Sequence, residues 1–210
     1  MSHVRTVYLQ TAAATAELLA VPELDAMWDE ISILPAFRVS GLAGHLARSI
    51  FQVDGYMDTP VGGRPPITAA VYIGELEDTA DINSSLNMSV RDRGDQAGQM
   101  GLEALVEAAK AGLEGLREKL ANEPAIRRIE VLGGRVLLLD EYLKTRIVEM
   151  IVHVEDLALS IDAGVGLPVD AIKIATDTVV AAGRMRHGDL AFLRGMTRRE
   201  RDDADATRVF

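Results

Sequence analysis

Two histidines and a glutamate have the types and spacing to hold a metal ion. Glu149 and His153 stand four residues apart in "TRIVEMIVHVEDLALS", residues 145–160. Residues at this spacing lie on one face of a helix, close enough to bind one ion together. His45, in "SGLAGHLARSIFQVDGYM", offers a third ligand from a separate segment. Two imidazoles and one carboxylate are a set that binds Zn²⁺ while keeping a coordination position open for water or substrate.

The polar stripe around Glu149 and His153 has two interpretations. On a helical wheel of about 100° per residue, four further polar residues fall within roughly 60° of Glu149. Lys144 and Glu155 form a second, narrower polar patch well away from the stripe. Either this second patch is the solvent face and the stripe points into the protein, or the stripe itself faces water and the long side chains snorkel at its margin. The further stripe residues are Tyr142, Arg146, Asp156 and Ser160.

His45 lies on a comparable polar line of its own helix. The alternative is that it is a half-exposed histidine on the wet side of that helix. The other two histidines are less suited to ligation, because His3 is near the N-terminal end and His187 lies in "RMRHGD", which reads as an exposed helix break. The residues aligned with His45 are Ser49, Gln52 and Tyr56.

Composition restricts the class of protein. Of the 210 residues, 48% are hydrophobic and 26% are charged, which is typical of a globular chain with its own core. We expect a single domain over residues 1–210. The formal net charge of −10 argues against nucleic acid or an anionic membrane as the main partner.

The absence of cysteine excludes disulfides and thiolate ligands, so that any sulfur chemistry needs a thiol from outside the chain. The N-terminal "MSHVRTVYLQ" lacks the pattern of a signal peptide, and no apolar run reaches membrane-spanning length. We therefore expect a cytoplasmic protein. Arginine outnumbers lysine and alanine is abundant, a bias that suggests a GC-rich bacterial genome.

Apolar spacing and helix-breaking prolines predict an all-α fold. Two β-type runs around Gly133 and Gly134 add a short β-hairpin. Together they favour an antiparallel four-helix bundle with the hairpin before the third long helix, which carries the polar stripe. We expect Ser40 and Asp140 to cap the two helices that carry the site residues. The predicted helices span about 4–20, 41–58, 95–122, 140–160 and 168 onwards.

Residues 61–93 are the hardest part of the chain to assign. "ITAAVYI" reads as a strand or an ordered loop, and "EDTADINSS" is polar. A loop this long is uncommon in a compact domain and often lies over a functional site. We expect this segment to form a lid over the metal site.

Two stretches, in this order, resemble the metal-binding domain of the mycothiol-dependent maleylpyruvate isomerases, a family of the DinB-like superfamily. "FRVSGLAGHLARS" is similar to the helix-two motif of the family. "LDEYLKTRIVEMIVHVEDLALSI" is similar to its second motif, in which Arg, Glu, His and Asp recur on one helix. The hairpin and "HGDLAFLRGM" also fit the family's layout, so the resemblance covers nearly the whole chain. The two motifs together are fairly specific for the superfamily and weak for any one reaction.

The resemblance implies a DinB-like up-down four-helix bundle that binds Zn²⁺ or a similar divalent ion through His45, Glu149 and His153. It also implies that the metal activates a low-molecular-weight thiol such as mycothiol. The isomerases carry a further C-terminal domain that helps to bind substrate, and we expect a chain of this length to lack it. The residues expected to support the ligands are Arg146, Asp156, Ser49 and Tyr142.

Two functions fit these features. The first is a metal- and thiol-dependent transferase or isomerase, in which the thiolate attacks a small electrophile such as an activated alkene or epoxide. The second is a non-catalytic bundle of the same fold, a small-molecule sensor or interaction module with a structural or vestigial metal. The expected partners are a small thiol and an electrophilic substrate, without nucleic acid or membrane. The oligomeric state is open, with a homodimer as one option.

Overall fold

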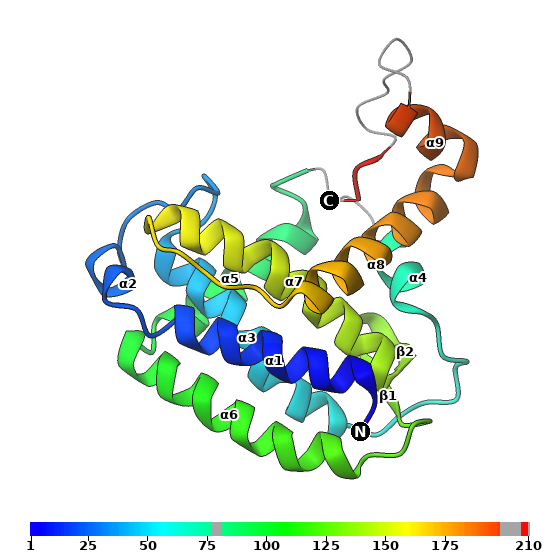
Figure 1. Ribbon diagram of the computed structural model, residues 1–210, viewed down its shortest axis with the longest axis horizontal. Coiled ribbons are helices and arrows are strands. Elements are labelled where there is room, and N and C mark those ends of the chain that lie inside the picture. Colours follow the sequence, from blue (N-terminus) through cyan, green and yellow to red (C-terminus); the bar gives the residue numbers. More distant parts are fainter. Residues whose placement is uncertain (77–80, 198–206, 210) are drawn as a thin grey trace.

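The protein is built mainly from helices, which confirms the predicted all-α fold (Figure 1). The computed structural model describes residues 1–76, 81–197 and 207–209. No helix in these ranges is long and apolar enough to cross a membrane. The helices are α1 (His3–Leu18), α2 (Pro22–Ala26), α3 (Val39–Met57), α4 (Ala69–Gly74), α5 (Ser85–Gly98), α6 (Leu102–Asn122), α7 (Leu139–Ser160), α8 (Val169–His187) and α9 (Asp189–Thr197), and the antiparallel hairpin consists of β1 (Arg128–Val131) and β2 (Arg135–Leu138).

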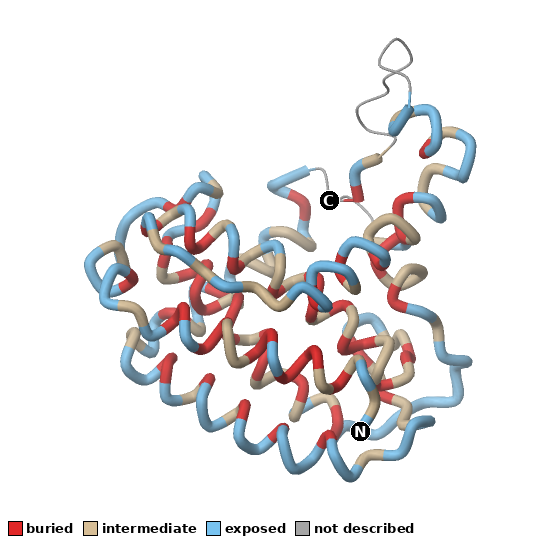
Figure 2. The backbone as a smooth tube through the Cα atoms, in the orientation of Figure 1, coloured by how far each residue is buried: buried red, intermediate tan, exposed pale blue. Residues whose placement is uncertain are grey.

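Helices α1, α3, α6 and α7 form the predicted four-helix bundle. The start of α1 meets the end of α6, where Arg5 Nη1 donates to the carbonyl oxygen of Leu120 at 3.0 Å. The end of α3 meets the start of α7, where the rings of Tyr56 and Tyr142 pack edge to face at 5.5 Å. Both of these helix pairs therefore run antiparallel. Figure 2 shows that the buried positions of the four helices face one another and enclose the core.

The hairpin stands directly before α7, the helix with the polar stripe, as predicted. The tight turn between its strands uses Gly133 and Gly134, whose φ angles are 78° and 68°. L-residues with side chains rarely adopt such values, which is why the glycine pair predicted a turn. Helix α7 is the fourth long helix along the chain rather than the third, because α1, α3 and α6 all precede it.

Residues 61–93 contain helices where a strand or a loop was expected. Thr68 caps α4, since its side chain accepts from the backbone N–H of Val71 at 3.3 Å. Asp95, the predicted start of the next long helix, lies inside α5. Gly101, with a φ angle of 85°, separates α5 from α6. The single long helix predicted from about residue 95 is therefore wrong, because this glycine ends one helix and begins another.

The two predicted cap residues lie inside their helices, so these predictions were wrong by two residues. The N-cap positions belong to Arg38 and Leu138, and neither makes a side-chain cap hydrogen bond. Ser40 lies in the first turn of α3. Asp140 lies in the first turn of α7, where its carboxylate accepts from Arg5 Nε at 2.7 Å. An acidic residue at this position is still favourable, because it faces the positive end of the helix dipole.

Glycines allow α5 to lie directly against α3. A Cβ atom on Gly44 would lie 2.2 Å from the carbonyl oxygen of Gly94, and one on Gly94 would lie 2.6 Å from that of Gly41. A Cβ atom on Gly98 would lie 2.5 Å from the carbonyl oxygen of Ser40. The two backbones therefore touch with no side chain between them. We call this contact, made by Gly41, Gly44, Gly94 and Gly98, the glycine seam.

Replacing Gly44 by Ala is expected to destabilise the protein by about 1–3 kcal/mol. The new methyl group would overlap backbone atoms of α5, which cannot rotate away as a side chain can. The change in the free energy of unfolding is measured by chemical denaturation. Gly55→Ala on the same helix is the matched control, because nothing lies within 4 Å of its added Cβ atom. That control should gain about 0.5–1 kcal/mol from helix propensity, and an equal gain from Gly44→Ala would contradict the seam.

Candidate metal centre

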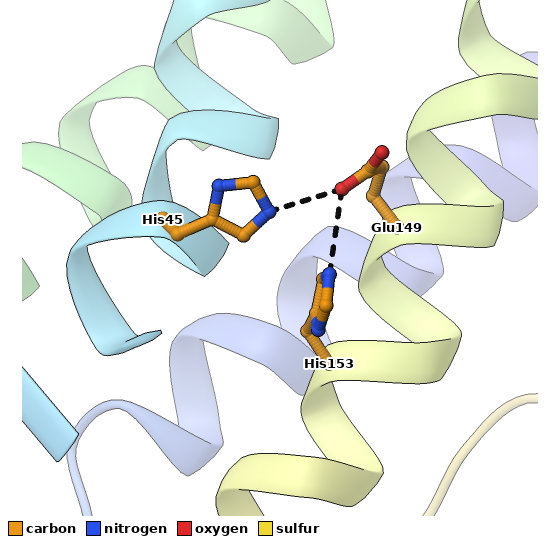
Figure 3. Close-up of side chains that lie close together, drawn as sticks. All are labelled: His45, Glu149 and His153. Atoms are coloured by element: carbon orange, nitrogen blue, oxygen red, sulfur yellow. Dashed lines mark hydrogen bonds and ion pairs between the residues drawn. The ribbon is translucent and has the colours of Figure 1, made fainter. Parts of the chain in front are cut away.

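His45, Glu149 and His153 meet between the facing sides of α3 and α7 (Figure 3). His45 Nε2 lies 3.0 Å from Glu149 Oε2, and His153 Nε2 lies 3.7 Å from the same oxygen. One ligand atom from each residue lies within 4.8 Å of the other two. The three side chains are only 13%, 26% and 22% exposed. The polar stripe of α7 therefore faces α3 and is not the plain solvent face of the helix.

The positions of the three donor atoms fit a single divalent ion. Ligand atoms bound tetrahedrally to Zn²⁺ at about 2.0–2.2 Å lie roughly 3.4 Å apart. The observed separations of 3.0 and 3.7 Å lie on either side of this value. Within the described part of the chain, these residues form the one group of His, Cys, Asp or Glu side chains that could hold an ion.

Two further residues of α7 hold the cluster in place. Asp156 Oδ2 lies 3.0 Å from His153 Nδ1, which keeps that ring nitrogen protonated and leaves Nε2 free to act as a ligand. Arg146 Nη2 lies 3.7 Å from Glu149 Oε1, the carboxylate oxygen that points away from His45. Each contact occupies the atom that is not needed for ligation.

The charge states suit ligation as well. Burial lowers the pKa of His45 below its usual value, although its hydrogen bond to Glu149 opposes that effect. Burial alone would raise the pKa of Glu149, but the hydrogen bond from His45 and the charge of Arg146 outweigh it and leave the pKa well below the usual range. A neutral imidazole beside an ionised carboxylate is the combination that binds a divalent ion.

Tyr142 and Ser49 are buried close to the cluster without a hydrogen bond to it. The Tyr142 ring lies 5.1 Å from the guanidinium carbon of Arg146. Ser49 is 1% exposed, and its backbone carbonyl accepts from the Tyr8 hydroxyl at 3.0 Å. Neither the Tyr142 hydroxyl nor the Ser49 hydroxyl has a hydrogen-bond partner among the described residues. Tyr142 thus supports Arg146 through its ring, while Ser49 contributes to the core.

The cluster opens onto a cavity of about 920 Å³, large enough for a small organic molecule. Its walls come from α3, α4, α5, α7, the hairpin and the residues around Phe37. Much of the wall belongs to the 61–93 segment, from Tyr72 on α4 to Arg93 on α5. The segment thus borders the site, and its closure as a lid stays a prediction.

Four arginines of this cavity were not identified from the sequence. Arg48 could have been found, because it stands three residues after His45 on the same helix. The others belong to α5 and the hairpin, and the helical course of α5 was not predicted. The four residues are Arg48, Arg91, Arg93 and Arg135.

Comparison with known proteins places this fold in a family. The family model of the mycothiol maleylpyruvate isomerase N-terminal domain matches residues 8–158, which include α3 and most of α7. A crystal structure of a histidine-to-alanine mutant of the mycothiol-dependent maleylpyruvate isomerase is similar to this chain, with 15% identity and a TM-score of 0.53, over 86% of this chain and 68% of that one. This likeness shows a shared fold and confirms the predicted DinB-like arrangement. A search of curated proteins gave no match. The chain belongs to the mycothiol maleylpyruvate isomerase N-terminal domain family.

Proposed function

We propose that His45, Glu149 and His153 bind a divalent metal ion, with Zn²⁺ as the first candidate. The proposal is carried by the convergence of three donor atoms from two helices at separations that suit one ion. Three light-atom ligands leave a coordination position open toward the cavity. Zn²⁺ bound there would favour the thiolate form of a thiol placed beside it.

We further propose that the protein transfers or isomerises a small electrophile with the help of a thiol such as mycothiol. The family model and the similar structure both belong to proteins named for mycothiol. The chain contains no cysteine, so its own residues cannot supply a thiolate nucleophile. The cavity wall would hold the electrophile next to the cluster and shield it from bulk water.

Titration of the Co²⁺-loaded protein with thiols tests this function. Mycothiol should produce a sulfur-to-metal charge-transfer band, and bacillithiol and glutathione serve as comparison thiols. The His153→Ala variant should give no band with any of them, because it lacks a ligand to the ion. Turnover is then measured on a panel of activated alkenes and epoxides.

A protein that binds one metal ion but neither gives a thiol band nor turns over an electrophile would contradict the enzymatic proposal. In that case a small-molecule sensor or interaction module with a structural metal accounts for the site. A metal ion that is bound by four protein ligands and has no exchangeable water would support that second function.

A further inference from the structure

The cavity is lined by four arginines that form no ion pair with an acidic residue of the described chain. Arg48 of α3, Arg91 and Arg93 of α5, and Arg135 of β2 all line it, and we call them the arginine wall. Across residues 1–76, 81–197 and 207–209, none of the four forms an ion pair. Four guanidinium charges at one cavity therefore lack a counter-charge from the described protein.

Among the described residues, the arginine wall makes only neutral contacts. Arg48 Nη2 donates to Gln52 Oε1 at 3.4 Å, which is a long hydrogen bond. Arg93 donates to the Ser89 hydroxyl, and Arg91 to the backbone carbonyl of Ile82. The guanidinium carbon of Arg135 lies 5.9 Å from the centre of the Tyr72 ring. These contacts position the guanidinium groups and leave their charges uncompensated.

A shortage of acidic residues does not explain this arrangement. The chain has 32 acidic residues against 22 basic ones, and arginines elsewhere pair with them, as Arg184 does with Asp189 at 2.7 Å. The described lining of the cavity includes two carboxylates. Glu149 is engaged by His45, and Glu75 lies at the end of α4 without an ion pair to a described residue. The concentration of positive charge is thus a local feature of the cavity in an acidic protein.

The positive charges also act on one another. Burial lowers the pKa of Arg48, and the neighbouring charges of Arg93 and Arg146 lower it further. Like charges held together at a partly buried position reduce stability. Proteins keep such unfavourable arrangements mainly where a ligand compensates them.

We propose that the arginine wall is an anion-binding subsite for a carboxylate or phosphate group of a small molecule bound in the cavity. The planar guanidinium fork binds such oxyanions through paired, charge-assisted hydrogen bonds. Arg48 stands about one helical turn from His45 on α3. A small molecule whose anionic group is bound by Arg48 would therefore place its other atoms near the metal cluster. The subsite does not depend on the proposed thiol chemistry.

Anion binding to the full-length, metal-free protein tests the subsite. Calorimetric titrations at low ionic strength use inorganic phosphate and succinate as probes, with chloride at matched ionic strength to detect non-specific screening. Wild-type protein should bind phosphate or succinate, and the preferred probe distinguishes a phosphate site from a carboxylate site. The R48Q/R93Q double variant should bind that probe at least about tenfold more weakly, because two charged donors are lost. R48K/R93K should fall between the two, because it keeps the charge but loses the fork.

Arg194→Gln is the control, because Arg194 is an exposed residue of α9 outside the cavity, and its replacement removes one positive charge without changing the cavity wall. It should bind the probes like wild type. Without a probe, R48Q/R93Q should melt at the same temperature as wild type or higher, since repulsion is relieved. A lower melting temperature of R48Q/R93Q, unchanged probe binding by it, or equal binding of chloride would each overturn the subsite.

Discussion

Replacing His153 or His45 by Ala is expected to weaken Zn²⁺ binding by more than about a hundredfold. Each substitution leaves only two ligands, and even the loss of a residue that merely orients a ligand costs about 10–100-fold in affinity. Asp156→Ala should therefore show an intermediate loss, because it removes only the carboxylate that holds His153 Nδ1 at 3.0 Å. Competition with a chromophoric chelator measures all three affinities.

His187→Ala is the control for these metal titrations. His187 Nε2 lies 2.7 Å from the backbone carbonyl oxygen of Arg208, far along the chain from the cluster. Its removal should leave the affinity and the stoichiometry of one ion per chain unchanged. Equal affinity of wild type and His153→Ala, with both proteins folded by circular dichroism, would show that the cluster is not the metal site.

Replacing Arg5 by Met is expected to cost about 3 kcal/mol of stability. The Arg5 side chain is 3% exposed and donates to Asp140 Oδ1 and to three backbone carbonyls at the end of α6. Methionine preserves the volume of the side chain but leaves the carboxylate and the carbonyls without their donor. The estimate is at the low end for a buried ion pair, because Asp140 is 24% exposed and water can reach it.

The matched control for Arg5→Met is Arg117→Met. Arg117 pairs with Glu114 at 3.2 Å on the outer face of α6, where the two side chains are 49% and 74% exposed. Exposed pairs of this kind contribute little, so this variant should lose less than about 0.5 kcal/mol. Urea denaturation of the two variants compares them directly. Equal losses would mean that Arg5 does not join α1, α6 and α7 as described.

The sequence predicted those features that local patterns determine. The polar stripe of α7 was visible because Glu149 and His153 repeat at helical spacing between apolar residues. The hairpin followed from its glycine pair. The meeting of His45 with this stripe was proposed from residue types and from the family resemblance, since no local pattern in the sequence reports on the distance between two helices.

Features that depend on distant contacts were missed. Helix α5 carries no strong apolar stripe, because the glycine seam holds it against α3 in place of large apolar side chains. Arg5 looks like an ordinary charged residue near the N-terminal end, and its partners lie more than 100 residues away. Such roles follow only from the packing of the whole bundle.

In α5, one set of residues packs against α3 and a different set lines the cavity. Its glycines at 94 and 98 fix the helix against α3 through backbone contact, whereas Leu86, Val90 and Arg93 face the cavity. The residues that would meet a ligand are therefore different from those that secure the helix. Substitutions at the cavity positions can change the shape and charge of the wall while α5 keeps its place, so ligand preference can diverge among related chains without a new bundle.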